Sequence, residues 1–501
     1  MSGKRRRGLL AFAVASTLAL TASLVSARLI GRSNAAPQAV SARPNIVFVL
    51  TDDLAWNLVK YMPHVQQMQR QGATFVNYFV TDSLCCPSRA SIFTGRYPHD
   101  TGIFTNGGND GGFQLFHMRG EESDTFATRL QARGYITGMM GKYLNGYQPQ
   151  GSVDGRTAYI PPGWNEWDVA GNGYPEFDYM LNENGRLVRY GHEPQDYLTD
   201  VVAAKGEAFI DHAAQAHKPF LLEIATFAPH APYTPAPRNA DDFPGLQAPR
   251  TQAFNEADVS DKPAWLRSHP LLTDQQIAQI DAAFRKRAQA VEAVDALIAR
   301  LQETVARDGI AGDTYFFFSS DNGYHMGDHR LRPGKMTAFE TDTRVPLIVL
   351  GPGIAHARTI THIAENIDLN PTFLRLAHTD VAPTVDGQSL VPLFGKRPVS
   401  NWREAALIEH HGPDLNASDP DRPRPGSGNP TTYEALRIPG ATYAEYADGE
   451  REYYNLRNDP FELTNTAPQL SSKRLQQLHT LLSALENCHT SASCRRAAPS
   501  R

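Results

Sequence analysis

Short apolar runs along the chain end in polar residues with useful chemistry. Three of these runs cover residues 46–50, 220–225 and 315–319, and they precede Asp52-Asp53, His230 and Asp321-Asn322 respectively. Near-continuous apolar runs of this length are typical of strands buried on both faces, as in a parallel sheet. Functional groups gather beyond the carboxyl ends of such strands. The three runs therefore predict one shared site.

Two longer segments between these runs have helical periodicity. They cover residues 197–214 and 273–307, and a further apolar run at 345–350 adds a strand. Alternating strands and helices predict an α/β fold. We expect a large mixed, mostly parallel sheet flanked by helices on both faces.

The composition of the chain and the elements that it predicts change after about residue 385. Residues 414–432 are rich in Pro, Gly, Asp and Ser and predict a long loop, which could wall the site or simply connect elements. Three short strands are expected at 433–437, 441–446 and 452–456, and a last helix carries a leucine face. We therefore expect a large domain over 44–385 and a smaller α+β subdomain, built on an antiparallel sheet, over 386–501.

The first 35 residues have the layout of a secretory signal peptide. A basic run at 4–7 precedes an apolar run at 9–25, and small-residue cleavage sites end at Ala27 and Ala35. The arginine pair in the basic run also fits a twin-arginine signal, which implies export after folding. An uncleaved membrane anchor is the alternative, because the apolar run is just long enough to span a bilayer. We expect a secreted or extracytoplasmic protein without stable membrane insertion.

Composition and net charge limit the kinds of partner that the protein can bind. The 501 residues are 41% hydrophobic and 20% charged, which is typical of a folded globular protein. Loss of the first 35 residues removes six basic and no acidic residues, so the formal net charge falls from −5 to −11. Such an acidic protein is a poor partner for nucleic acid or an anionic membrane. If the protein binds an anion, the positive charge must be local.

The four cysteines form two pairs along the sequence. Cys488 and Cys494 lie near the C-terminus and can close a small structural disulfide in an oxidising compartment. Cys85 and Cys86 are adjacent, so their Cα atoms are about 3.8 Å apart, shorter than a disulfide normally allows. These two thiols therefore need another role.

Cys85 opens the segment Cys-Cys-Pro-Ser-Arg, directly before an apolar stretch that can form a helix. A cysteine at a helix N-terminus beside a cation is the usual environment of an activated nucleophile, although these residues could also form a structural turn. The longer string, residues 85–96, resembles the signature of the sulfatase family. In that family the first cysteine of C-x-P-S-R is oxidised to formylglycine by a dedicated enzyme. The resemblance implies that Cys85 becomes the catalytic aldehyde.

The strand-end residues with oxygen donors are Asp52, Asp53, Asp321 and Asn322. Such donors suit a hard divalent cation, Ca²⁺ or Mg²⁺, although each pair alone is also common in turns. Residues 44–53 resemble the N-terminal strand of sulfatases, and residues 320–327 resemble their late metal-binding turn. The resemblance implies that the four residues bind Ca²⁺, with Mg²⁺ as the alternative, together with Cys85 as formylglycine.

The resemblance also covers the positive charges that an anionic substrate needs. The matching residues are Arg89, Lys142, His230 and Lys335. Arg89 follows Cys85 by four residues, about one helical turn, so both can face one pocket. By resemblance, the two lysines grip the sulfate, and His230 contacts the ester oxygen and can protonate the leaving group.

The chain departs from the family pattern at one position. Many sulfatases have a histidine two residues after the lysine matched by Lys142, but here that residue is Leu144, followed by Asn145. This form resembles the N-acetylglucosamine-6-sulfatase branch, as do the adjacent cysteines and the C-terminal cysteine pair. The general acid could therefore come from elsewhere, with His325 as a second candidate. Three further polar residues have no assigned role: Glu409, His410 and His411.

We therefore expect a sulfuric ester hydrolase acting on a sulfated small molecule or glycan, with the 6-sulfate of N-acetylglucosamine suggested by the branch. One alternative is a phosphate or phosphonate ester hydrolase on the same scaffold. Another is a catalytically silent glycan-binding relative in which Cys85 stays a thiol. Fold resemblance alone does not separate these functions. The other expected partner is the formylglycine-generating enzyme.

Overall fold

The computed structural model describes residues 43–416, 419 and 421–498, so the predicted signal peptide lies outside the described residues. Within these ranges, ten strands form one large sheet. In spatial order they are β13 (Arg358–Ile360), β2 (Ala73–Phe75), β12 (Leu347–Leu350), β11 (Thr314–Ser320), β1 (Asn45–Thr51), β10 (Phe220–Ala225), β4 (Ile136–Lys142), β7 (Glu166–Ala170), β8 (Met180–Glu183) and β9 (Arg186–Arg189). The centre, β11 to β7, is parallel, and antiparallel pairings flank it. The predicted mixed, mostly parallel sheet is confirmed.

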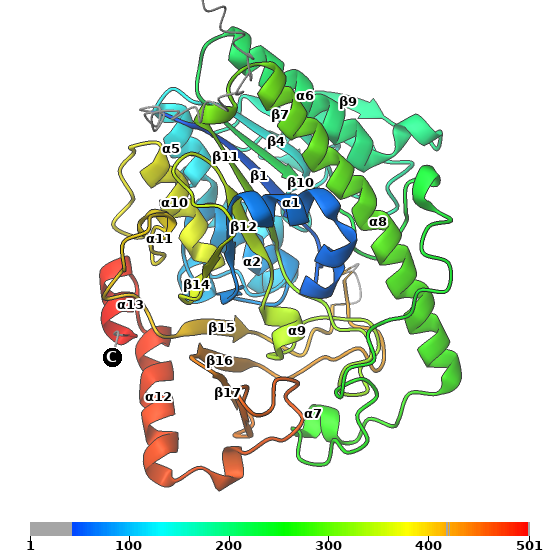
Figure 1. The fold of residues 1–501 in the computed structure, drawn as a ribbon, viewed down its shortest axis with the longest axis vertical. Helices are drawn as coiled ribbons and strands as arrows, with labels where there is room; N and C mark the ends of the chain where they lie inside the picture. Colours follow the sequence, from blue (N-terminus) through cyan, green and yellow to red (C-terminus); the bar gives the residue numbers. More distant parts are fainter. Residues whose placement is uncertain (1–42, 417–418, 420, 499–501) are drawn as a thin grey trace, which may run out of the picture. The chain divides into compact units, whose positions relative to one another are not determined.

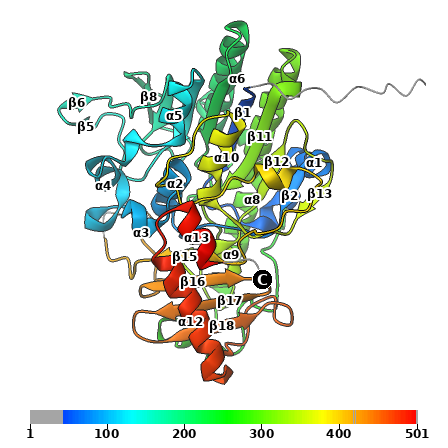
Figure 2. The ribbon, with the colours of Figure 1, turned by 90° about the vertical axis from the view of Figure 1, so that its left-hand side faces the viewer.

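Helices cover both faces of this sheet (Figure 1, Figure 2). Side chains of β1 alternate between two cores, with Ile46 and Phe48 in one and Val47 and Val49 in the other. The first core includes residues of α2 (Cys85–Thr94), α5 (Phe126–Ala132) and α10 (Leu369–Leu376). The second includes residues of α1 (Pro63–Gln71), α6 (Leu198–Gln215) and α8 (Asp274–Arg307). The helices predicted at 197–214 and 273–307 are α6 and α8.

A second sheet, antiparallel, follows in the C-terminal part of the chain. Its strands are β15 (Ala406–His410), β16 (Tyr433–Ile438), β17 (Ala441–Tyr446) and β18 (Arg451–Asn455). The last three match the predicted strands, whereas the sequence pattern does not predict β15. The leucine face of α12 (Ser472–Glu486) packs with this sheet (Figure 2), and Cys488 and Cys494 form the expected disulfide.

His99 joins this C-terminal part to the segment that follows α2. It lies in α3 (Pro98–Thr101), and its Nδ1 and Nε2 are 2.9 and 2.8 Å from Glu409 and the carbonyl oxygen of Cys488. Burial alone would lower the pKa of His99, but the hydrogen bond and charge of Glu409 raise it from 6.5 to about 9. Both ring nitrogens therefore donate, and the side chain is an imidazolium at neutral pH.

We predict that stability falls as the pH rises towards 9. Because the folded-state pKa of His99 is raised, its contribution is complete below about pH 6.5 and is lost as pH rises through about 9, up to about 3 kcal/mol. Urea denaturation at pH 6 and pH 9.5 measures this difference. His99→Gln should flatten the dependence, whereas His356→Gln, an exposed control, should not. Equal pH dependence in all three proteins would contradict the assignment.

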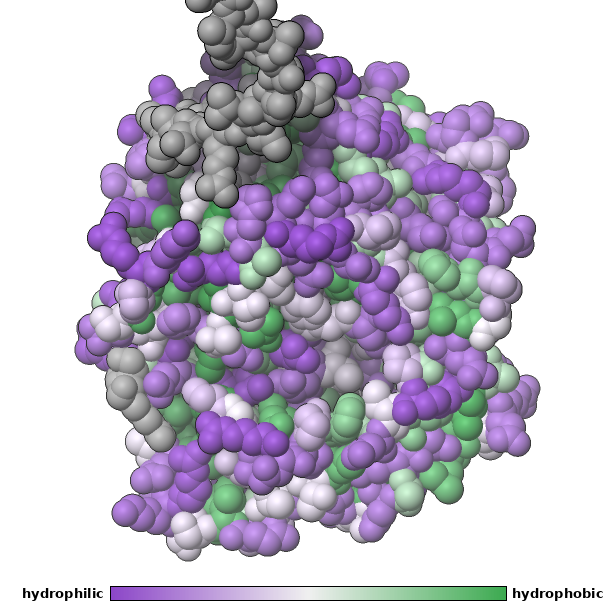
Figure 3. All heavy atoms as spheres, viewed as in Figure 1, coloured by the Kyte–Doolittle hydropathy of each residue, from purple (hydrophilic) through white to green (hydrophobic). Residues whose placement is uncertain are grey.

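Polar side chains cover most of the molecular face seen in Figure 3, and apolar ones are scattered among them. Among the helices of the described residues, none combines the length and the apolar character needed to cross a bilayer.

Candidate active site

Two parallel strand ends bring the predicted metal ligands together. The final residues of β1 and β11, Thr51 and Ser320, are paired, so Asp52-Asp53 and Asp321-Asn322 leave the sheet side by side. All four side chains are buried. The backbone N–H of Asp53 donates to Asp321 Oδ1 at 3.1 Å, and Asn322 Nδ2 donates to Asp53 Oδ1 at 2.7 Å.

Cys85, the first residue of α2, is fully buried next to these carboxylates. Its Sγ lies 3.2 Å from Asp52 Oδ1 and 2.8 Å from Lys335 Nζ. Burial raises the pKa of the thiol well above its ordinary value, and the charges of Asp321 and Asp52 raise it further. The unmodified thiol is therefore protonated. This is not the environment of an activated thiolate, so the sulfur itself is a poor nucleophile here.

Three buried cations pair with the three carboxylates. The pairs are Arg89 with Asp321, Lys142 with Asp52, and Lys335 with Asp53, at N···O distances of 2.8, 2.6 and 2.7 Å. Burial would lower the pKa of each lysine, but the adjacent carboxylates raise it well above the ordinary value. Both lysines therefore stay charged. The site thus gathers three buried positive charges, each of which is balanced by a carboxylate in this structure.

His230 lies in the turn after β10 and faces the same cluster. Its Nδ1 is 2.7 Å from the carbonyl oxygen of Ala231, and its Nε2 is 3.6 Å from Asp53 Oδ2 and hydrogen-bonded to Asp421 Oδ1. Burial would lower the pKa of His230, but Asp421 and Asp53 raise it overall. The imidazole therefore holds a proton on the nitrogen that faces the site, which is what a general acid requires.

The residues present fit a divalent cation. Ligand atoms of Asp52, Asp53, Cys85 and His230 all lie within 4.8 Å of one another. The Oδ1 atom of Asn322 is buried without a hydrogen-bond partner among the described residues. A free amide oxygen beside several carboxylates is a donor set that Ca²⁺ or Mg²⁺ prefers.

Three polar residues that contact this cluster received no role from the sequence: Asn106, Asn145 and Asp421. The Nδ2 atoms of Asn106 and Asn145 donate to Asp421 Oδ2 at 3.1 and 3.0 Å. Leu144 is buried in the apolar core, so this part of the chain presents Asn145, in addition to Lys142, to the site. The departure at Leu144 was the one signal that could have drawn attention to Asn145.

The other residues with open roles have partners outside this cluster. Both ring nitrogens of His325 are engaged, at 2.9 Å from Asp342 Oδ2 and 3.0 Å from the Ser427 carbonyl oxygen. Glu409 pairs with His99, His411 with Asp110, and His410 lies 3.5 Å from Asp82. Of the two candidate acids, His230 is therefore the one with its proton directed at the site.

Comparison with known proteins identifies the family. The sulfatase family model matches residues 44–379, and the model for the C-terminal part of N-sulphoglucosamine sulphohydrolase matches residues 327–488. Human N-acetylglucosamine-6-sulfatase is 35% identical over 481 residues, covering 90% of this chain and 86% of that protein. The chain belongs to the sulfatase family. The goat N-acetylglucosamine-6-sulfatase is 34% identical to this sulfatase, covering 91% of this chain and 85% of the relative.

Solved structures agree on the fold. A structure described as a complex with its substrate D-glucosamine-2-N,6-O-disulfate superimposes on this sulfatase with a TM-score of 0.70, covering 88% of this chain and 97% of the other, at 24% identity. A phosphonate monoester hydrolase of Agrobacterium radiobacter matches with a TM-score of 0.67 over 88% of this chain and 95% of its own, at 20% identity. The predicted fold and the predicted enzyme class, a sulfatase, are confirmed.

Proposed function

We propose that this sulfatase hydrolyses the 6-sulfate of N-acetylglucosamine or of a related sulfated glycan, using formylglycine made from Cys85 and a bound Ca²⁺. The observation that carries the proposal is the 35% identity to N-acetylglucosamine-6-sulfatase over 90% of the chain. The buried cations around Cys85 support it, because a sulfate ester is an anion and develops further negative charge as it reacts.

In this proposal Asp52, Asp53, Asp321 and Asn322 hold the cation. Formylglycine at position 85 would supply a hydroxyl nucleophile, and the cation would lower the pKa of that hydroxyl. Lys335, whose Nζ is 2.8 Å from Cys85 Sγ, and Lys142 hold the sulfate beside the reacting atom. His230 gives its Nε2 proton to the leaving sugar oxygen.

Arg89 holds the predicted metal ligand Asp321 and the backbone of Lys142 in place. Its Nε donates to Asp321 Oδ2 at 2.8 Å and its Nη1 to the carbonyl oxygen of Lys142 at 2.9 Å. One buried guanidinium thus fixes both a ligand of the cation and the strand end that carries the first sulfate-binding lysine. Arg89 contributes mainly by positioning and by its charge.

Release of inorganic sulfate from N-acetylglucosamine 6-sulfate tests the proposal directly. The comparison substrates are the 3-sulfate isomer and the 6-phosphate of the same sugar. We expect kcat/KM for the 6-sulfate to exceed both by about 100-fold or more, because a buried site discriminates strongly by charge and position. Faster release of phosphate would favour the phosphate or phosphonate ester hydrolase, whose fold this chain shares.

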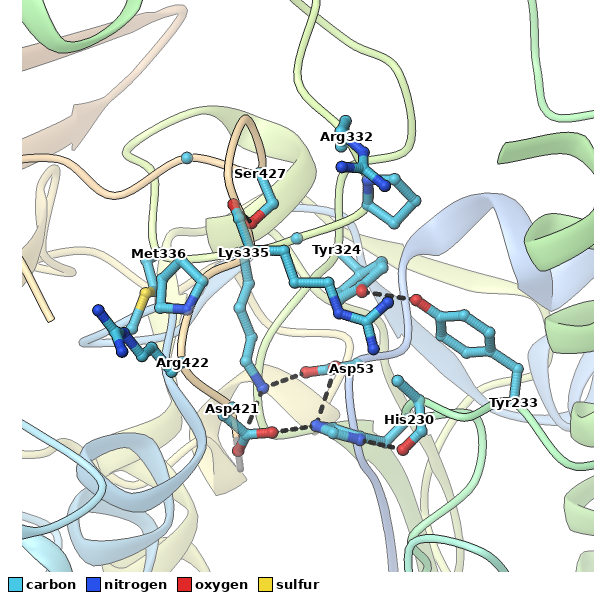
Figure 4. Close-up of a pocket in the computed structure, with 16 residues that line it drawn as sticks. Asp53, His230, Tyr233, Tyr324, Arg332, Lys335, Met336, Asp421, Arg422 and Ser427 are labelled. Atoms are coloured by element: carbon cyan, nitrogen blue, oxygen red, sulfur yellow. Dashed lines mark hydrogen bonds and ion pairs between the residues drawn. The ribbon is translucent and has the colours of Figure 1, made fainter. Parts of the chain in front are cut away.

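The pocket above Lys335 favours a substrate with more than one anionic group. Arg332, Arg422 and Arg424 line its wall. Figure 4 shows the first two. Arg422 and Arg424 are exposed, and neither forms an ion pair with a carboxylate of the described residues. Unpaired guanidinium groups at the mouth of a pocket suit the sulfate or carboxylate groups of a sulfated glycan.

We predict that Arg422→Gln combined with Arg424→Gln raises KM for a multiply sulfated oligosaccharide by about 10-fold and leaves kcat nearly unchanged. KM for singly sulfated N-acetylglucosamine should change less. Steady-state kinetics at low and high salt measures both effects, with Arg496→Gln, near the C-terminus, as an exposed control. Equal changes for the two substrates would contradict a role in binding additional anionic groups.

The proposed function also requires export of the protein and conversion of Cys85 to formylglycine. Residues 1–35 would direct the protein out of the cytoplasm, and extracellular sulfatases occur among the relatives, including a Drosophila SULF-1 homologue 35% identical over 74% of this chain. Cys85 is fully buried in the folded protein, so the formylglycine-generating enzyme must reach it before folding is complete.

A further inference from the structure

A carboxylate of this chain lies inside the cluster of cations. Asp421 belongs to the Pro- and Gly-rich segment 414–432, whose described residues form neither helix nor strand. Its side chain is nevertheless 0% exposed. The next residue, Arg422, is exposed at the pocket wall. Segment 414–432 thus places one buried carboxylate, that of Asp421, in the site.

Three hydrogen-bond donors and one lysine, all from separate parts of the chain, surround this carboxylate. Asp421 Oδ2 accepts hydrogen bonds from Asn106 Nδ2 and Asn145 Nδ2 at 3.1 and 3.0 Å and lies 3.8 Å from Lys335 Nζ. Asp421 Oδ1 accepts a hydrogen bond from His230 Nε2 (Figure 4). The surrounding groups are therefore three hydrogen-bond donors, namely two neutral amides and the His230 imidazole, and one nearby cation, Lys335, which together have the composition of an oxyanion site.

The electrostatics agree with this description. Burial would raise the pKa of Asp421, but the charges of His230 and Lys335 hold it well below its ordinary value. The donors therefore stabilise a full negative charge in a place shielded from water. Lys335 also lies 2.8 Å from Cys85 Sγ, so the oxyanion site adjoins the reacting atom.

We infer that Asp421 occupies the place of the substrate's sulfate group, and that Asn106 and Asn145 bind that sulfate, together with His230 and Lys335, once Asp421 has moved out. This inference rests on the proposed function, because it takes sulfate as the anion that enters. A sulfate and a carboxylate cannot share these donors, since two like charges in contact repel strongly when they are buried. Asp421 is therefore an internal competitor of the substrate.

The local backbone is compatible with such an exchange. The backbone N–H of Asp421 donates to Asp419 Oδ1 at 2.8 Å, and that of Arg422 donates to Asp419 O at 3.1 Å, so both bonds stay within the segment. The Asp421 side chain, in contrast, bonds to three segments distant in sequence. When Asp421 leaves the site, the donors that bonded to its carboxylate can bond to the incoming sulfate instead.

Calorimetric titration of the full chain with inorganic sulfate, in saturating Ca²⁺, tests the inference. Asp421→Ala should bind sulfate about 10-fold or more tightly than the unaltered protein, because no internal anion has to be displaced. Asp241→Asn, an exposed carboxylate with the same change of net charge, should leave the affinity unchanged. Asp421→Asn, which keeps the size of the side chain, is the second variant if the alanine form does not fold.

Two results would overturn the inference. Sulfate binding to Asp421→Ala that is equal to or weaker than that of the unaltered protein would show that the carboxylate does not compete. A 10-fold fall in kcat with unchanged sulfate affinity would instead make Asp421 a positioning residue for His230.

The two asparagines have their own test. Adding Asn106→Ala or Asn145→Ala to the Asp421→Ala protein should weaken sulfate binding about 10-fold, whereas unchanged affinity would remove them from the sulfate site. These titrations need no turnover. Failure to hydrolyse any sulfate ester would therefore contradict the proposed function and still leave the competition measurable.

Discussion

Replacement of Cys85 by alanine should lower kcat for sulfate ester hydrolysis by about 10⁴-fold or more, the scale on which enzymes lose activity with their nucleophile. The reason is local. Cys85 Sγ lies 2.8 Å from Lys335 Nζ and 3.2 Å from Asp52 Oδ1, so position 85 is where an attacking atom meets both the cations and the predicted metal ligands. Sulfate release from a sulfated sugar measures the loss.

Cys85→Ser should stop after a single turnover, which tests the formylglycine mechanism more directly. A serine hydroxyl can attack the sulfur atom, form a new O–S bond and expel the sugar alcohol. The serine sulfate has no second hydroxyl on the same carbon through which to release the sulfate. We therefore expect at most one equivalent of alcohol per enzyme and a stable sulfated serine, both visible by mass spectrometry. Repeated turnover by the serine variant would contradict a formylglycine mechanism.

Cys86→Ala is the matched control. Cys86 is also fully buried, but it belongs to the apolar core on one face of the sheet. Its loss should cost about 1 kcal/mol of stability and leave kcat within a few-fold. Mass spectrometry of the peptide that contains both residues, from protein made in the native host, should show an aldehyde at position 85. An unmodified thiol at that position would support the silent glycan-binding alternative.

The central strands of the large sheet could be predicted because their burial requires runs of apolar residues. Strands β1, β10 and β11 are buried on both faces by helices, so each has a mostly apolar centre, and the apolar run ends where the polar site begins. The strand ends then had to meet, since parallel neighbours end at the same edge of a sheet. The same reasoning could not give β15, because this buried strand ends in Glu409 and His410, whose partners come from distant segments.

Asp421 and the roles of its two asparagine partners could not be predicted from the sequence, for a related reason. Asn106, Asn145 and Asp421 follow no periodicity, and nothing in their local sequence shows that three segments bring them to one point. Burial also reversed the expectation for Cys85. A helix N-terminus and a nearby arginine suggest a lowered pKa of the thiol, but the surrounding carboxylates and the loss of water raise it. Only the folded structure decides between these opposing effects.

Removal of divalent ions by a chelator should abolish hydrolysis and also weaken sulfate binding. The predicted metal ligands include three carboxylates, and three cations pair with them, with Lys142 Nζ 2.6 Å from Asp52 and Lys335 Nζ 2.7 Å from Asp53. A divalent cation held by these carboxylates would offset their negative charge and so weaken their hold on both lysines. Together with that cation, these three pairs would carry an excess of two positive charges, which matches a sulfate dianion. Ca²⁺ and sulfate should therefore favour each other's binding.

Thermal and urea denaturation with Ca²⁺ and sulfate, added separately and together, measures this coupling. Ca²⁺ at about 100 times its dissociation constant should raise the free energy of unfolding by about 2.7 kcal/mol. Sulfate should stabilise the Ca²⁺-loaded protein clearly more than the chelated one. Asp321→Asn should lose most of both effects, because it removes a ligand and the partner of Arg89, whereas Asp258→Asn, on the surface, should keep them. Equal stabilisation by sulfate with and without Ca²⁺ would show that the lysines bind the anion independently of the metal, and it would contradict this account of the site.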